Sequence, residues 1–221
     1  MRSLLLIAGS VLALGLATPV VAATVSGTTF TVKITNVSKD DTLKVPGAAA
    51  VKAPIAPGVF VVDHAAAAFA PGKPASAELQ ALAEDGNFEP LQRVLEAKYG
   101  DHAGMFVPGL EFEVVAQPGD KLSFATMFVQ SNDKFYAPAN GTLDLFDANG
   151  KPVAGDATAL VKLFDAGTEV DQQPGAGPDQ APRQKAANQG ANQDGVVAEA
   201  DDGFAYPPVD SVIRVEITPV N

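Results

Sequence analysis

Cysteine and tryptophan are absent from the 221-residue sequence, and histidine occurs only twice. Without cysteine the chain has no disulfide, no thiol nucleophile, no thiolate ligand for a metal and no N-terminal cysteine that could carry a lipid. The fold must therefore be held by a hydrophobic core, with or without the help of a bound ion.

The same scarcity argues against catalysis. His64 and His102 lie in unrelated loop-like segments, without the spacing of an HExxH or another metal-ligating motif. The chain has no GxSxG elbow, phosphate-binding loop or dinucleotide fingerprint. Paired carboxylates can hydrolyse glycosides, but a chain without tryptophan offers little aromatic platform for a sugar. We therefore expect that the protein is not an enzyme, and a carboxylate-dependent hydrolase is the weakest alternative.

The chain has far fewer cationic than acidic side chains. The 15 lysines and arginines face 26 acidic residues, which gives a formal net charge of -11 at pH 7. Such a charge repels phosphate backbones and anionic lipid surfaces, so we expect no nucleic-acid partner. A divalent cation is a more natural partner for so acidic a chain.

The longest apolar stretch stands at the N-terminus. Arg2 precedes an apolar run over residues 4–16, and Pro19 and the small residues 21–23 follow it. This is the pattern of a secretory signal that is cleaved after Ala23. A membrane anchor needs about 20 apolar residues with charged flanks, and this run is shorter and interrupted. We predict a signal peptide over residues 1–23 and an exported chain over 24–221 that is periplasmic or extracellular and has no transmembrane segment.

Residues 24–221 are predicted to form one mainly β domain. Apolar and polar residues alternate over 28–37, which is the pattern of a half-buried strand. Short strand-like runs recur along the chain at 58–64, 110–116, 121–130, 142–147, 159–165 and 211–220. Turn signals such as Asn149-Gly150 separate them. Many short strands with turns between them are typical of an antiparallel β-sandwich.

Two segments depart from the β pattern. Residues 74–100 place leucines at helical spacing and have Gly86 and Gly100 as stops, which predicts two short helices inserted as a layer on the sandwich. Residues 170–203 are poor in large apolar side chains and rich in glutamine, asparagine, proline, glycine and acid. Such a segment buries too little apolar surface to order itself, so we expect a long polar loop that is partly mobile.

Carboxylates follow two of the predicted strands. Asp133 comes after the strand at 121–130, and Asp165 and Glu169 come at the end of the strand at 159–165. If these strand ends meet at one edge of the sandwich, the three side chains form an oxygen cage of the kind that Ca²⁺ requires. The alternative is that they are ordinary solvated loop acids, which is the more common situation for such residues.

The stretches LSFATMFVQSNDKFYAP at 122–138 and GDATALVKLFDAGTEVDQQPG at 155–175 resemble the central motifs of the spondin domain. That family includes the F-spondin and mindin matrix proteins and many short bacterial secreted proteins. The resemblance extends more loosely over most of the remaining chain. It implies a C2-like β-sandwich.

The resemblance also implies a Ca²⁺ ion held by Asp133, Asp165 and Glu169. The sequence departs from the motifs of eukaryotic members at nearby positions: Lys134 and Phe164 stand where those motifs have tryptophan, and Glu169 stands where they have aspartate. A lysine beside the ion would weaken cation binding if its side chain pointed inward.

Two functional hypotheses follow. The first is a secreted or periplasmic calcium-binding module with a role in adhesion or recognition, as the animal members of the family imply. Its partner would be a protein, a glycan or an anionic surface ligand. The second is a structural envelope protein in which the ion only stabilises the fold. The sequence contains no evidence on oligomeric state.

Overall fold

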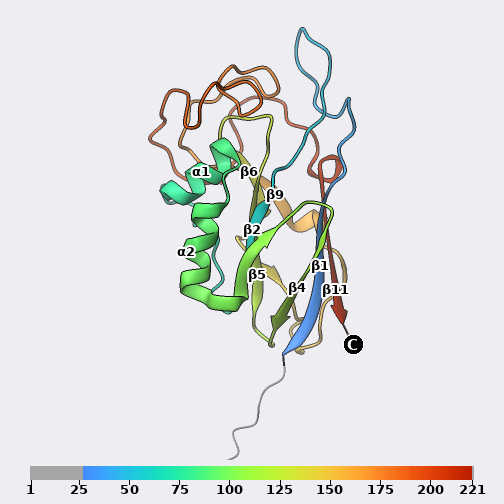
Figure 1. The fold of residues 1–221 in the computed structure, drawn as a ribbon. Helices are drawn as coiled ribbons and strands as arrows, with labels where there is room; N and C mark the ends of the chain where they lie inside the picture. The colour runs from blue at the N-terminus through green and yellow to red at the C-terminus, as the bar shows by residue number, and fades with distance from the viewer. Residues whose placement is uncertain (1–26, 221) are drawn as a thin grey trace, which may run out of the picture.

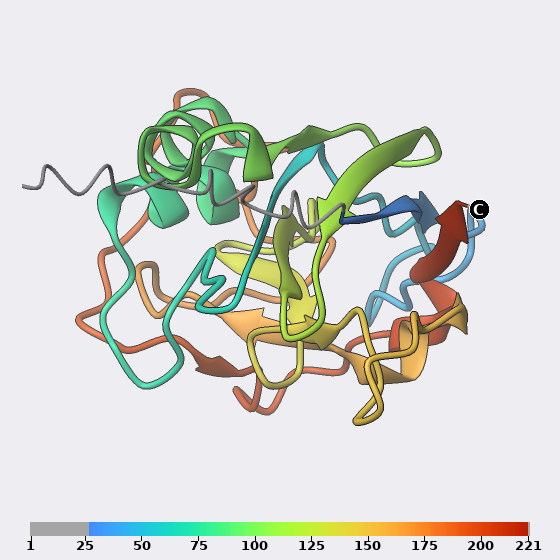
Figure 2. The ribbon, with the colours of Figure 1, turned by 90° about the horizontal axis from the view of Figure 1, so that it is seen from below.

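The computed structural model describes residues 27–220, so the predicted signal peptide over 1–23 lies outside the described residues. Two antiparallel sheets pack face to face, and two helices cover the outer side of one of them (Figures 1 and 2). The predicted mainly β sandwich with a short helical insertion is confirmed. Within 27–220 no helix is both long and apolar enough to cross a bilayer.

The first sheet joins the two ends of the described chain. Its strand order is β4 (Glu111–Ala116), β1 (Thr28–Asn36), β11 (Ile213–Val220) and β8 (Gly155–Asp156). In β1 the alternate residues Phe30, Val32 and Ile34 are fully buried between the sheets. The period-two pattern of the sequence therefore marks a strand with one face on the core.

The inner strands of the second sheet are buried on both faces. Its order is β10 (Ala198–Glu199), β9 (Val161–Asp165), β6 (Lys134–Pro138), β5 (Lys121–Met127), β2 (Gly58–Asp63) and β3 (Ala103–Phe106), and β7 (Leu143–Asp144) also pairs with β5. In β2, Phe60 and Val62 face the inter-sheet core, whereas Val59 and Val61 pack with the helices. A strand covered on both sides reads as a continuous apolar run.

The helices lie where the spacing predicts them, as α1 (Ala77–Asp85) and α2 (Glu89–Tyr99). Ser76 caps α1, because its hydroxyl accepts a hydrogen bond from the Leu79 N–H at 3.3 Å. Leu82 of α1 and Leu95 of α2 belong to the same buried cluster as Phe135 of β6. Burying one such side chain contributes about 1.5–3 kcal/mol, and this attaches the helical layer to the sheet. Three single 3-10 turns complete the elements: η1 (Gly100–His102), η2 (Thr158–Leu160) and η3 (Val209–Ser211).

Strand β6 was not predicted as a separate element. The predicted strand at 121–130 ends at Met127, and a tight turn returns the chain so that β6 pairs with β5 on one side and β9 on the other. All five residues of β6 are buried, and the first of them is Lys134. An ionisable residue is almost never fully buried without a partner, so the sequence did not mark this strand as an interior one.

The loop over 170–203 lies across one end of the sandwich beside α1 and is drawn in orange to red-brown in Figure 1. It packs by hydrogen bonding. Gln180 is fully buried; its amide nitrogen donates to the Gln173 carbonyl at 3.0 Å, and its amide oxygen accepts from the Gly175 N–H at 3.1 Å. The prediction of a polar loop rested on its lack of apolar surface, and a buried polar network is a second way to hold such a segment.

Candidate functional site

Five charged residues converge at the end of the sandwich under this loop, and we call them the acidic centre: Asp133, Lys134, Asp165, Asp171 and Asp202. Strand pairing brings the first three together, because Lys134 at the start of β6 lies opposite Asp165 at the end of β9. The loop that follows β9 supplies Asp171, and the segment before β11 supplies Asp202. Residues remote in sequence therefore meet at one point.

The ammonium group of Lys134 lies at the middle of the acidic centre. Its Nζ is 2.9 Å from Asp165 Oδ2, 3.4 Å from Asp133 Oδ1 and 3.3 Å from Asp202 Oδ2, and it also contacts Asp171. The side chain of Lys134 has no solvent exposure at all. A lysine buried to this degree needs compensation for its lost hydration, and four carboxylates provide it.

Backbone donors in the turn after β9 hold Asp133 and Asp165 in place. Asp133 Oδ2 accepts hydrogen bonds from the N–H groups of Thr168 at 2.8 Å and Glu169 at 3.1 Å. Asp165 Oδ1 accepts from the Gly167 N–H at 2.6 Å. The turn after β9 is therefore wrapped around the Asp133 side chain. Gly167 suits this turn because its φ is +69°, a region that favours glycine.

The other two carboxylates differ in their support. Asp202 accepts hydrogen bonds from the Tyr206 hydroxyl at 2.6 Å and from the Phe204 N–H at 2.9 Å. Asp171 accepts one from Lys134, and no further donor to it is found in residues 27–220. Asp171 thus depends on the ammonium more than its neighbours do.

The pKa values follow from this distribution of donors. Burial lowers the pKa of Lys134, but Asp133 and Asp165 outweigh burial and raise it, so the amine is charged. Burial raises the pKa of Asp133 despite the adjacent ammonium, and it raises the pKa of Asp171 to about 6. Burial also acts to raise the pKa of Asp202, but its hydrogen bonds and the Lys134 charge together lower it.

Glu169 is not part of the acidic centre. Its side chain is buried and accepts a hydrogen bond from Asn132 Nδ2 at 2.8 Å. Burial raises its pKa to about 7, and the charge of Glu84, a buried residue of α1, contributes in the same direction. The predicted set of Asp133, Asp165 and Glu169 is therefore only partly assembled. The three carboxylates that each place an oxygen within 4.8 Å of the others are Asp133, Asp165 and Asp171.

Sequence reasoning missed Asp171 and Asp202. A signal for Asp171 was present, because it is the third carboxylate of the segment 165–171, after Asp165 and Glu169. Asp202 gave no such signal, since a long loop separates it from β9 and loop closure alone brings it back.

A divalent ion does not fit the acidic centre as it stands. Ca²⁺ takes six to eight oxygen ligands at about 2.3–2.6 Å. The oxygens of Asp133, Asp165 and Asp171 surround a point that Lys134 Nζ already occupies. An ion could use these oxygens only after the ammonium had left.

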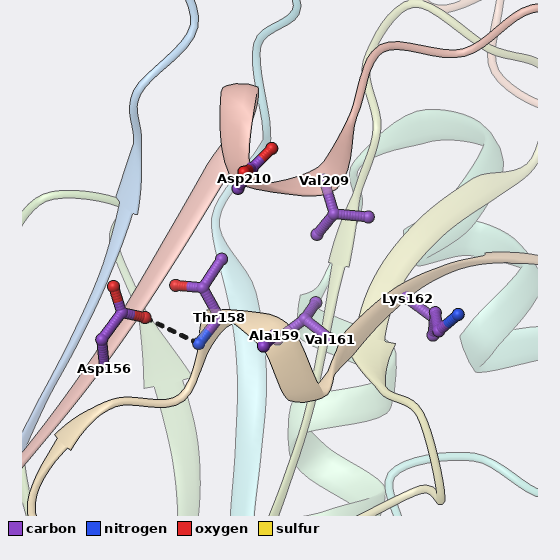
Figure 3. A pocket seen from close by; sticks show the side chains of 7 residues that line it. All are labelled: Asp156, Thr158, Ala159, Val161, Lys162, Val209 and Asp210. Carbon is purple, nitrogen blue, oxygen red and sulfur yellow. Dashed lines mark hydrogen bonds between the residues drawn. The ribbon is translucent and has the colours of Figure 1, made fainter.

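The two histidines lie outside the acidic centre. His64 is exposed and pairs with Asp120, and His102 is exposed in a single 3-10 turn. A surface hollow of about 470 Å³ is shown in Figure 3 and is lined by Asp156, Thr158, Ala159, Val161, Lys162, Val209 and Asp210. Its Asp156 carboxylate accepts a hydrogen bond from the Thr158 N–H at 2.8 Å and thereby shapes a turn. No residue of the acidic centre lines this hollow.

Comparison of the chain with protein-family models and with curated proteins finds no match. The resemblance to the spondin domain therefore stays a prediction from the two motif stretches. What the protein does must be argued from the acidic centre and from the surface that it supports.

Proposed function

We propose that the protein is an exported, non-catalytic recognition module that binds its partner through the loop end of the sandwich. The observation that carries this proposal is the acidic centre itself. A charged cluster with no exposed ammonium has little to offer a substrate, but it fixes the turn after β9 and the segments around Asp171 and Asp202 relative to one another. Pre-organised loops on a rigid scaffold are a common way to build a binding surface.

The loop surface that includes the turn after β9 has a composition suited to recognition. Val170 and Val196 are 48% and 46% exposed. Their loop segments run side by side, because the Val170 N–H donates to the Ala191 carbonyl at 2.7 Å and the Gln193 N–H donates to the Thr168 carbonyl at 2.9 Å. Exposed apolar side chains among amide groups provide both buried area and hydrogen bonds on association.

Charge restricts the class of partner. The chain is strongly acidic, so polyanions are repelled unless a cation bridges them. Lys134 cannot act as that bridge, because its side chain is fully buried. The proposal therefore favours a neutral or cationic protein or glycan surface over an anionic ligand or a nucleic acid.

The predicted relationship to the spondin domain is consistent with this proposal. The two resembling stretches, 122–138 and 155–175, contain every residue of the acidic centre except Asp202. The adhesive role that the resemblance implies is a form of recognition. The proposal does not depend on which cation holds the loops, because a Ca²⁺ ion that displaced the ammonium would support the same surface.

The structural envelope protein remains the alternative function, and a binding experiment separates the two. The mature protein, coupled to fluorescent beads, is tested for adhesion to peptidoglycan sacculi, chitin, cellulose and wells coated with basic or neutral proteins. The variant Val170→Ser/Val196→Ser alters the proposed surface, and Val94→Ser/Val115→Ser alters two equally exposed valines on α2 and β4.

Adhesion to one of these surfaces that is lost in the loop variant and kept in the control variant supports the proposal. Adhesion that both variants keep places the binding surface elsewhere. Adhesion to none of the surfaces favours the structural alternative.

A further inference from the structure

We propose that the ammonium of Lys134 is the permanent cation of the acidic centre and takes the place of a metal ion, so that the protein folds and works without calcium. This inference concerns how the centre is neutralised and goes beyond the recognition function. It is an alternative to the calcium expectation, since the chain carries its own counter-ion.

Geometry is the first support. Nζ has carboxylate oxygens on several sides, supplied by the turn before β6, the end of β9, the loop after β9 and the segment before β11. A bound cation arranges flexible loops in the same way, because carboxylates from several loops all contact the one ion. Two cations cannot share that point, because their repulsion in a poorly hydrated site far exceeds its value in water.

The position of Lys134 on a strand is the second support. Lys134 pairs in register with Asp165 across β6 and β9, and the next residues of β6, Phe135 and Tyr136, are fully buried. Its backbone is therefore fixed by the sheet, and a well-packed strand leaves the side chain little room to withdraw. A tethered cation loses no translational freedom on binding and needs no supply from the medium.

The charge balance gives the third support. It also predicts that the acidic centre would bind Ca²⁺ if the amine were removed. Four carboxylates face one ammonium, so the centre keeps a negative excess that backbone N–H groups and the Tyr206 hydroxyl partly offset. The oxygens of Asp133, Asp165 and Asp171 lie within 4.8 Å of one another, so removal of the amine would leave them without a cation. Flexible carboxylate loops around such a point are suited to Ca²⁺ rather than to the stricter octahedral Mg²⁺.

The test compares the mature wild type with Lys134→Met, which keeps most of the length of the side chain and removes its charge. The control is Lys162→Met on β9. Lys162 is half-exposed, and its Nζ lies 3.6 Å from Glu199 Oε2. Thermal unfolding midpoints are measured in EDTA and in millimolar Ca²⁺. We expect the wild type and Lys162→Met to be insensitive to the ion. We expect Lys134→Met to be much less stable in EDTA and to regain several degrees in Ca²⁺.

A wild-type midpoint that rises with Ca²⁺ would overturn the inference, and so would a Lys134→Met protein that is as stable as the wild type in EDTA. A second measurement on the wild type covers the case in which Lys134→Met does not fold. Amine acetylation followed by peptide mass spectrometry should find Lys134 protected to the same extent with and without Ca²⁺. Labelling of Lys134 on addition of Ca²⁺ would show that the ion displaces it. These outcomes are independent of the adhesion assay, so either proposal can fail while the other stands.

Discussion

The backbone N–H of Thr168 donates a 2.8 Å hydrogen bond to Oδ2 of Asp133, 35 residues earlier in the chain. The other carboxylate oxygen of Asp133 faces Lys134 Nζ. One side chain therefore supports the turn after β9 and helps to neutralise the ammonium. The charge can be removed without the hydrogen-bond acceptor, because an asparagine keeps the acceptor and loses the charge, whereas an alanine loses both.

Asp133→Ala should lower the free energy of unfolding by about 3 kcal/mol or more, since it leaves buried N–H groups and part of the ammonium charge without a partner. Asp133→Asn should cost less, because its amide oxygen still accepts from the backbone. Urea unfolding of both variants checks the order, with Asp41→Ala on an exposed loop as control. Equal losses for the two variants would show that only the charge matters.

Gly167→Ala tests the turn that wraps around Asp133. A Cβ at position 167 would lie 2.7 Å from the backbone nitrogen of Val196, and the φ of +69° adds strain. The control is Gly47→Ala, which has a similar φ of +72° and open space around it. We expect the control to lose about 1 kcal/mol from the left-handed backbone alone and Gly167→Ala to lose clearly more. Chemical denaturation measures both, and similar losses would mean that the neighbouring loop moves aside easily.

Stability should fall as pH rises from about 5 to 7.5. Burial raises the pKa of Glu169 to about 7 from an ordinary value of 4.5, so the folded state holds a proton that the unfolded chain releases at lower pH. The stabilisation linked to this proton is present below pH 4.5 and is lost as pH rises through 7. The free energy of unfolding should differ by about 2 kcal/mol between pH 5 and pH 7.5. Urea unfolding at pH 5 and pH 7.5 should show this fall in the free energy of unfolding for the wild type and a smaller fall for Glu169→Gln. An equal fall in both proteins would contradict the raised pKa of Glu169.

Gln180→Ala should loosen the long loop while the sandwich stays folded. The fully buried Gln180 amide bonds to Gln173 and Gly175, both within the loop. Limited proteolysis should therefore cleave residues 176–196 sooner in the variant, with a small change in the thermal midpoint. Gln193→Ala serves as control, since Gln193 is exposed. Unchanged proteolysis would show that the rest of the network holds the loop.

The strands and helices could be predicted from the sequence because buried apolar residues recur with the period of each element. Phe30, Val32 and Ile34 alternate with polar residues, and Leu91 and Leu95 repeat at helical spacing, so strand and helix were recognised from these positions. The acidic centre was recognised only in part. Asp133 and Asp165 follow strands that pair through β6, and this relationship could be expected from strand ends.

The remainder of the centre could not be predicted, for physical reasons. Lysine is among the residues least often buried, so an inward Lys134 ran against its usual behaviour. Glu169 turns away to bond with Asn132, and nothing in its spacing distinguishes that orientation. Asp202 reaches the centre only through the packing of a loop that was expected to be loosely held.

The dispersal of the acidic centre along the chain has a consequence for the order of folding. β1 pairs with β11, the last strand, and Lys134 receives its fourth carboxylate from Asp202. Neither the pairing of β1 with β11 nor the acidic centre can therefore be completed before these late residues of the chain are in place. Long-range closure of this kind is intrinsically slow. A chain synthesised from its N-terminus cannot fix its loop end until the segment around Asp202 has been made, so folding of the loop end has to follow synthesis of this segment.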